Sequence, residues 1–175
     1  MGGKKNSCGG YEMNYQKLFA MQKGLDEHIE TKHMLQEEDL FERKVLALLV
    51  ELGELANETR CFKFWSLRPS SPQQTVLEEY VDGVHFILSL GIECGFDGEN
   101  DFSAILRCKE TLTDQFLFVF ELISKFRASK SLIDYKQLLQ GYIHLGELLG
   151  FNSGDTENAY VDKNEVNYER QKQGY

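Results

Sequence analysis

Two pairs of acidic residues have a spacing that could bring four carboxylates into one site. Glu51 and Glu54 form the first pair, and Glu79 and Asp82 form the second. The i, i+3 spacing puts both side chains of a pair on one face of a helix. Glu54 lies seven residues before the predicted end of its helix, and Glu79 lies seven residues after the start of the next. At 1.5 Å per residue both are roughly 10 Å from the connecting loop, so antiparallel packing would bring the pairs to one height.

Four carboxylates at one level of a helical bundle repel one another strongly unless cations lie between them. A single Glu-x-x-Glu pair is usually solvated surface, but here apolar residues alternate with the acids: Leu52, Leu55, Tyr80 and Val81. The pattern therefore predicts a metal site. All-oxygen ligation favours hard ions, so we expect Mg²⁺, for which Mn²⁺ could substitute. Because Mg²⁺ usually shares its coordination with waters and substrate phosphates, the site points to phosphate chemistry.

Three more residues lie close to the acids in the sequence. His85 follows Asp82 by three residues, but the di-iron bundles that use such a motif need a second copy, and none occurs. His85 is therefore interpreted as a packing residue or a residue beside the site. In the connector between the two acidic helices, Trp65 could be a core anchor or could stack on a base. Lys63, in the same connector, could contact a phosphate.

A predicted helix over 156–171 presents cations and amides on one face. Lys163, Asn167 and Arg170 are spaced i, i+4, i+7, and Asn164 lies beside them. A solvated polar helix is the usual explanation, and a face that holds a polyphosphate is the alternative. Because the segment has little apolar surface, we expect it to be mobile until a polyphosphate docks.

The elements that must position these residues are helices. Only two prolines occur, both within 69–72, and the long proline-free stretches are rich in Leu, Glu, Lys and Gln. The sequence predicts an all-α bundle of five to six helices. Their expected ranges are 14–31, 39–61, 71–94, 111–126, 132–149 and from 156. Gln22 lies on the polar face of the first helix. Ser71 and Pro72 should open the third helix, and Gly95 should end it. Residues 1–12 are expected to be a flexible leader, and 13–175 a single domain.

Composition narrows the possible partners. The net charge of −9 opposes binding of a nucleic-acid polymer. No segment approaches the ~20 apolar residues of a membrane span. The four cysteines, Cys8, Cys61, Cys94 and Cys108, lack zinc-site spacing and are expected to be free thiols of a cytoplasmic protein. The fourth and fifth helices contain more apolar positions than one bundle can readily cover, which predicts a homodimer: Phe116, Phe118, Phe120, Leu138, Leu139 and Leu145.

Over about residues 14–175 the chain resembles the dimeric dUTPases, a branch of the all-α NTP pyrophosphatase superfamily that includes the MazG-like enzymes. The resemblance rests on five segments: Gln22 with Leu25-Asp26, Glu51-Leu-Gly-Glu54, Phe62-Lys63-x-Trp65, Glu79-Tyr-Val-Asp82-Gly-x-His85-Phe86, and Lys163-Asn164-x-x-Asn167-x-x-Arg170-Gln171-x-x-Gly174-Tyr175. The acidic pairs alone mark the superfamily. Their combination with Gln22 and the terminal segment is specific to the dUTPase branch.

The resemblance implies a homodimer that hydrolyses dUTP, and also dUDP, to dUMP, with part of each site supplied by the partner subunit. It implies that Mg²⁺ is bound by Glu51, Glu54, Glu79 and Asp82. It further implies that Gln22, Trp65 and Asn164 surround uracil, whereas phosphates and sugar are held by Lys63, Lys163, Asn167 and Arg170. Glu54, paired with Glu51, is the candidate catalytic carboxylate, which orients the attacking water and accepts its proton.

Two other functions stay open on the sequence. A broader all-α nucleoside triphosphate pyrophosphatase would share the acids but lack a strict preference for uracil. A non-enzymatic helical interaction module would use the acids for solubility alone. Stabilisation by Mg²⁺ and a dUTP analogue would separate the module from both enzymes, because only a protein that binds a ligand is stabilised by it.

Overall fold

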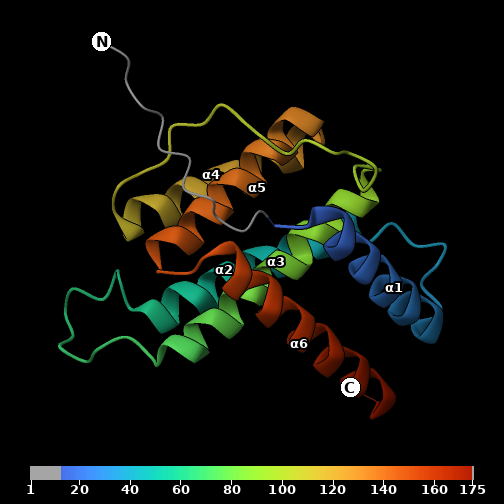
Figure 1. The fold of residues 1–175 in the computed structure, drawn as a ribbon, viewed down its shortest axis with the longest axis horizontal. Coiled ribbons are helices and arrows are strands. Elements are labelled where there is room, and N and C mark those ends of the chain that lie inside the picture. Colours follow the sequence, from blue (N-terminus) through green and yellow to red (C-terminus); the bar gives the residue numbers. More distant parts are fainter. Residues whose placement is uncertain (1–12, 175) are drawn as a thin grey trace.

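The computed structural model describes residues 13–174, which form six helices and no strand (Figure 1). The helices are α1 (Tyr15–His33), α2 (Phe41–Thr59), α3 (Gln73–Glu93), α4 (Leu112–Ser129), α5 (Leu132–Leu148) and α6 (Ser153–Lys172). The prediction of an all-α bundle is confirmed. The expected leader and Cys8 lie outside the described residues. Within them, no helix combines the length and apolar character required to cross a membrane.

Local hydrogen bonds explain where the helices begin and end. Asn14, Thr111 and Ser131 are N-caps whose side chains accept the backbone N–H three residues on. The prediction for α3 was wrong by one residue, because Pro72 takes the N-cap position and Gln73 begins the helix. Gly95, with φ of +73°, follows the end of α3 as expected.

Helix α6 begins earlier than the sequence pattern suggested, at Ser153 instead of near Thr156. Asn152 and Asp155 form a capping box, in which each side chain accepts the other residue's backbone N–H. The segment 152–155, interpreted as a turn, is in fact the cap and first turn of the helix.

Helix α3 is the centre of the bundle, and it contacts α1, α2, α5 and α6. It forms one hairpin with α2, while α4 and α5 form a second (Figure 1). Eleven of the 21 residues of α3 are buried, among them Val81, Ile87 and Leu88. Because α3 carries one acidic pair and α2 the other, the central hairpin also positions the candidate site.

A reciprocal contact between two tyrosines holds α3 against α5. The rings of Tyr80 and Tyr142 stack with centroids 5.0 Å apart. The Tyr142 hydroxyl donates to the Tyr80 carbonyl at 2.9 Å, and the Tyr80 hydroxyl lies 3.5 Å from the Tyr142 carbonyl. Gly83 and Gly146 make room for the two hydroxyl groups. Since Tyr80 lies between the acids of the second pair, this contact fixes the height of both carboxylates.

Replacing Gly83 with Ala is expected to lower the free energy of unfolding by about 1–3 kcal/mol, because the added Cβ would overlap the Tyr142 hydroxyl. Gly53→Ala on α2 is the matched control, since a Cβ there meets no atom of the described residues within 4 Å. Because alanine favours a helix more than glycine does, Gly53→Ala should raise the free energy of unfolding by roughly 0.5–1 kcal/mol. Denaturant titration of both variants measures the difference, and equal stabilities would contradict the tyrosine packing.

The reason given for a dimer was wrong, although the dimer itself stays a prediction. Phe116, Leu138, Leu139 and Leu145 are buried within the single chain, and the other two aromatic residues of that set are half-buried. Large apolar side chains that are exposed lie elsewhere, mainly on α2, in the α2–α3 connector and at two positions of α4 and α5: Leu46, Val50, Phe62, Phe64, Trp65, Leu67, Leu117 and Ile133.

Candidate active site

Three of the four predicted acids lie together where α2 faces α3. Glu51, Glu79 and Asp82 each offer a carboxylate oxygen, and these oxygens lie within 4.8 Å of one another. All three side chains are half-buried. Glu54 is exposed and lies outside this group, although it is close enough for its charge to act on the other three. The antiparallel hairpin thus brings the two pairs together as expected, with Glu54 at the open side.

The acids disfavour one another's charged forms. Burial raises the pKa of Glu51 to about 7, and the charges of Asp82, Glu54 and Glu79 add to the effect. Burial is also the largest cause of the raised pKa values of Glu79 and Asp82. A divalent cation among these oxygens would remove the repulsion, so the donor set fits a hard metal ion such as Mg²⁺.

One cation of the protein already contacts the acids. Lys163, on α6, places its Nζ 2.6 Å from Asp82 Oδ2, and both side chains are largely covered. This ion pair lowers the pKa of Asp82 and partly offsets the effect of burial. It also ties α6 to α3 beside the carboxylate cluster.

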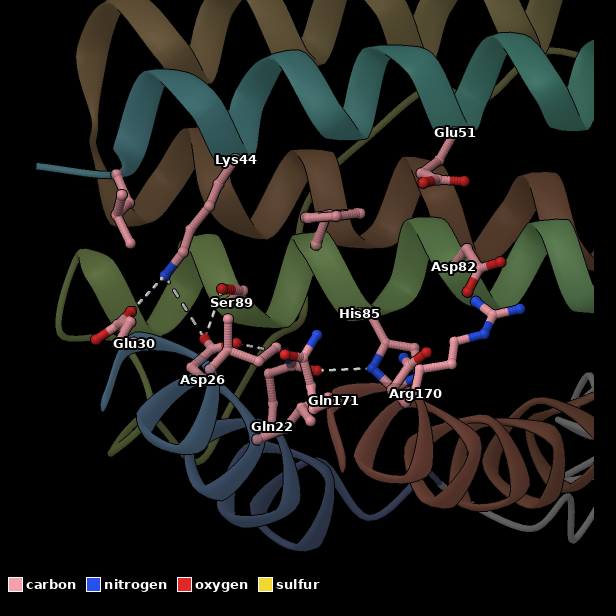
Figure 2. A pocket seen from close by; sticks show the side chains of 15 residues that line it. Gln22, Asp26, Glu30, Lys44, Glu51, Asp82, His85, Ser89, Arg170 and Gln171 are labelled. Carbon is pink, nitrogen blue, oxygen red and sulfur yellow. Dashed lines mark hydrogen bonds and ion pairs between the residues drawn. The ribbon is translucent and has the colours of Figure 1, made fainter. Parts of the chain in front are cut away.

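A cavity of about 350 Å³ extends from the acids between α1, α2, α3 and α6. Figure 2 shows Glu51, Asp82 and Arg170 at one end of it and Lys44 at the other. Gln22 and His85 lie between the two ends. The cavity therefore joins the carboxylate cluster to a polar wall of amide and imidazole groups.

That wall is a continuous hydrogen-bond network. Gln22 Nε2 donates to Asp26 Oδ1 at 2.7 Å, and Ser89 Oγ donates to Asp26 Oδ2 at 2.5 Å. Gln22 Oε1 lies 2.7 Å from the Tyr160 hydroxyl and 2.8 Å from His85 Nδ1. The His85 ring stacks on Tyr160, with centroids 4.1 Å apart. The network draws side chains from α1, α3 and α6.

The network fixes the protonation of His85. Burial, aided by the charge of Lys163, lowers the pKa of His85 to about 3, so the ring is neutral at pH 7. Because Gln22 Oε1 can only accept, the proton lies on Nδ1, and Nε2 carries a lone pair. This buried Nε2 finds no hydrogen-bond partner among residues 13–174, and neither does Asn164 Nδ2. Buried polar atoms without partners are costly, so both are candidates for contact with a ligand.

The structure brings half of the twelve predicted site residues to the lining of the cavity. Those that line it are Gln22, Glu51, Asp82, His85, Asn167 and Arg170. Lys63 and Trp65 lie away from it in the α2–α3 connector, where Lys63 stacks over Phe62 and Trp65 is 64% exposed beside Phe64. Asn164 is buried near Tyr160 and does not reach the lining.

Sequence reasoning missed three residues of the cavity and its network. Ser89 and Lys44 both line the cavity, and Tyr160 bonds to Gln22. Ser89 lies seven residues after Asp82, and Lys44 seven before Glu51, so helical periodicity could have placed both on the faces that carry the acids. For Tyr160, no spacing in the sequence indicates the partner on α1.

An all-α bundle with clustered carboxylates at one end of a polar cavity is the arrangement expected of a helical enzyme that acts on nucleoside phosphates. A family model described as dUTPase matches residues 14–175. The chain belongs to the dimeric all-α dUTPase family, and it is a dUTP diphosphatase, a hydrolase of nucleotide metabolism. A comparison with curated protein sequences finds no match.

The stability of the metal-free protein should depend on pH through Glu51. Its pKa is about 7 in the folded chain against 4.5 ordinarily, so the native state binds the extra proton between these values. The free energy of unfolding due to Glu51 therefore falls as the pH rises through that window. Glu51→Gln should become increasingly more stable than the parent chain as the pH rises from about 5 to about 8.

Urea titrations of both chains in a chelator measure this gap. The comparison is needed because His85, with its lowered pKa, acts in the opposite direction below its ordinary value of 6.5. A gap that stays constant with pH would show that Glu51 titrates normally.

Proposed function

We propose that the chain hydrolyses dUTP, and also dUDP, to dUMP in a reaction that requires Mg²⁺ and accepts Mn²⁺. The observation that carries the proposal is that one cavity joins the carboxylate cluster to the Gln22–His85 wall. The first feature suits a metal-bound polyphosphate, and the second suits a base with both donors and acceptors.

Glu51, Glu79 and Asp82 would hold the metal ion, with Glu54 at the solvent side. Bound there, Mg²⁺ would neutralise charge on the phosphate oxygens and lower the pKa of the attacking water. Glu54 is exposed and next to the cluster. We assign to Glu54 the orientation of the water for in-line attack on phosphorus and the acceptance of its proton, with Glu51 beside it.

The face of α6 would bind the phosphates and sugar. Asn167 and Arg170 line the cavity, Arg170 at its acidic end (Figure 2), and Lys163 contacts Asp82. A divalent ion bound to Asp82 would neutralise the negative charge of that carboxylate, which in the free protein is paired with the Lys163 ammonium. The ammonium can then turn to a phosphate oxygen, which places two cations and an amide around the leaving group.

Uracil would be read by the wall of the cavity. His85 Nε2 accepts from the N3–H of uracil, and the second N–H of Gln22 Nε2 donates to a neighbouring carbonyl. Asn164 does not line the cavity in this structure, and its side chain would have to turn toward the base for Nδ2 to supply a further donor. Cytosine presents a lone pair at N3, which would face the lone pair of His85, and a site built this way rejects it because its polar groups are left unpaired.

Lys63 and Trp65 would act across the interface of a homodimer. Both lie outside the cavity of their own chain, and the connector exposes a cluster of apolar side chains. The mass of one chain is 20.2 kDa, and sedimentation should show a species with twice that mass. A species with only the mass of one chain would contradict the dimer.

Subunit mixing tests the shared site. Trp65→Ala and Glu79→Gln should each be inactive alone. A mixed dimer, however, contains one site with Glu79 and the partner's Trp65 both intact. Equimolar mixing should therefore restore about a quarter of the parent activity. No recovery in a mixture that exchanges subunits would place Trp65 at the site of its own chain.

The decisive experiment for the activity is a panel of deoxynucleoside triphosphates assayed with Mg²⁺, Mn²⁺, Ca²⁺ or EDTA. We expect rapid release of dUMP from dUTP with Mg²⁺ or Mn²⁺, poor support by Ca²⁺, and no reaction in EDTA. Equal rates on dUTP, dATP, dCTP, dGTP and dTTP would favour the broader pyrophosphatase. Activity that survives exhaustive chelation would overturn the metal site.

A further inference from the structure

We propose that Asp26 is a positioning residue that fixes the orientation of the Gln22 amide and, through it, the tautomer of His85, and so sets the preference for uracil over cytosine. This inference rests on the proposed function, because it explains how the same wall reads the base. Asp26 acts through Gln22. It is the end of the chain of hydrogen bonds that leads from α1 to the imidazole (Figure 2).

The first step is the orientation of Gln22. Asp26 lies four residues after Gln22 on α1, and its Oδ1 is 2.7 Å from Gln22 Nε2. A carboxylate can only accept, so it attracts the amide NH₂ and repels the amide oxygen. Gln22 Oε1 must then face the other way, toward the Tyr160 hydroxyl and His85 Nδ1. Turning the amide over would bring two acceptors together at Asp26.

The second step is the anchoring of Asp26 itself. Ser89 Oγ, on α3, donates to its other oxygen at 2.5 Å, and Lys44 Nζ, on α2, lies 3.7 Å from that oxygen. Lys44 also pairs with Glu30 at 3.3 Å and with Glu93 at 2.5 Å, so it is held in place from two sides. Burial raises the pKa of Asp26 and the charge of Lys44 opposes that shift, while the contacts from Ser89 and Lys44 prevent the carboxylate from rotating away from Gln22.

The third step is the tautomer. With Gln22 Oε1 facing His85, the imidazole proton must lie on Nδ1, which leaves Nε2 as an acceptor. The lone pair on Nε2 matches the N3–H of uracil and opposes the N3 lone pair of cytosine. The choice of base thus depends on the carboxylate of Asp26, which acts on His85 through Gln22.

Asp26→Asn tests this with almost no change of shape. The new side chain can donate as well as accept, so Gln22 can turn over and offer its NH₂ to His85. The imidazole then carries its proton on Nε2 and can donate to the N3 of cytosine. We expect the ratio of kcat/KM for dUTP to that for dCTP to fall by roughly tenfold or more, since about 1.4 kcal/mol of preference corresponds to a factor of ten.

A second readout needs neither metal nor substrate. The ¹⁵N and ¹H signals of the His85 imidazole in the nucleotide-free protein report which nitrogen carries the proton. The parent chain should show Nδ1–H alone, and Asp26→Asn should show a mixture that contains Nε2–H. Glu27→Gln is the matched control, because it removes an exposed charge from the next position of the same helix. It should leave both the kinetic ratio and the tautomer unchanged.

The outcomes separate this inference from the proposed function. A parent chain that turns over dUTP and dCTP equally would contradict the reading of uracil itself. A parent chain that prefers dUTP, with a folded Asp26→Asn variant that keeps both that preference and Nδ1–H, would overturn the role of Asp26. If Asp26→Asn does not fold, Ser89→Ala decides, because it removes the hydroxyl that anchors the Asp26 carboxylate beside Gln22. That variant should also show mixed tautomers and a reduced ratio, and an unchanged tautomer would overturn the inference.

Discussion

Glu51→Gln and Glu79→Gln are each expected to abolish dUTP hydrolysis and to leave the fold intact or more stable. Both substitutions remove a charge from a group of carboxylates whose oxygens lie within 4.8 Å of one another. The metal ion loses a ligand, whereas the metal-free bundle loses repulsion. Turnover of dUTP should fall by roughly 10³-fold or more, the scale of losing a principal electrostatic group of an active site.

Glu78→Gln is the matched control, since Glu78 is exposed on the same helix and bonds to Gln74 instead of the cluster. It should keep full activity. Calorimetric titration with Mg²⁺ adds an independent measure, because the two cluster variants should bind the ion weakly or not at all. Activity near that of the parent chain in either cluster variant would contradict the metal-site assignment.

Truncation after Tyr160 is expected to leave a folded, Mg²⁺-binding protein with almost no dUTPase activity. The buried residues of α6 are Thr156, Glu157, Tyr160 and Asn164, so three of the four remain in the shortened chain. The removed part contains Lys163, Asn167 and Arg170, which we propose to hold the phosphates and to exclude water from the reacting centre. Circular dichroism, Mg²⁺ titration and dUTP turnover test the three parts of this prediction.

Hydrogen exchange shows whether α6 closes on the substrate. From Glu165 to Lys172 the helix is exposed or half-buried, so its amides should exchange rapidly in the free protein. With Mg²⁺ and a non-hydrolysable dUTP analogue they should be strongly protected. Glu165→Gln, on the exposed side of α6, should behave as the parent chain does. Equal protection with and without ligand would make α6 a fixed wall, and its closing role would be wrong.

The sequence was sufficient for the fold because its helices are marked locally. Capping residues such as Asn14 and Ser131, and Gly95 after α3, are short-range signals that tertiary packing does not override here. The one-residue error at Pro72 and the three-residue error at the start of α6 are differences of cap assignment. The use of the apolar faces was harder to predict. Phe116 and Leu138 lie at helical spacing with the other buried residues of α4 and α5, but periodicity does not say whether such a face packs within one chain or against a partner.

For the site, spacing within helices was enough to find the acids, since i, i+3 pairs on two helices of one hairpin must meet. It could not show that Glu54 is exposed while Glu51 is half-buried, because that depends on how α2 is rotated against α3. Nor could it reveal the bond between Tyr160 and Gln22, which joins residues 138 positions apart. Contacts between distant helices follow from tertiary packing, and a single sequence carries no direct record of them.

Helix α3 shows what the active site takes from the rest of the molecule. Between Tyr80 and Gly91 its only polar side chains are Asp82, His85 and Ser89, and these form one narrow seam along an otherwise apolar stretch of the helix. At each of the three positions a leucine or alanine would continue the packing of the bundle. The polar residues of the site thus lower the stability of the core, and they are kept because the activity needs them. Any descendant freed from the need to hydrolyse nucleotides could close the seam, and it would gain stability at the positions where it lost its activity.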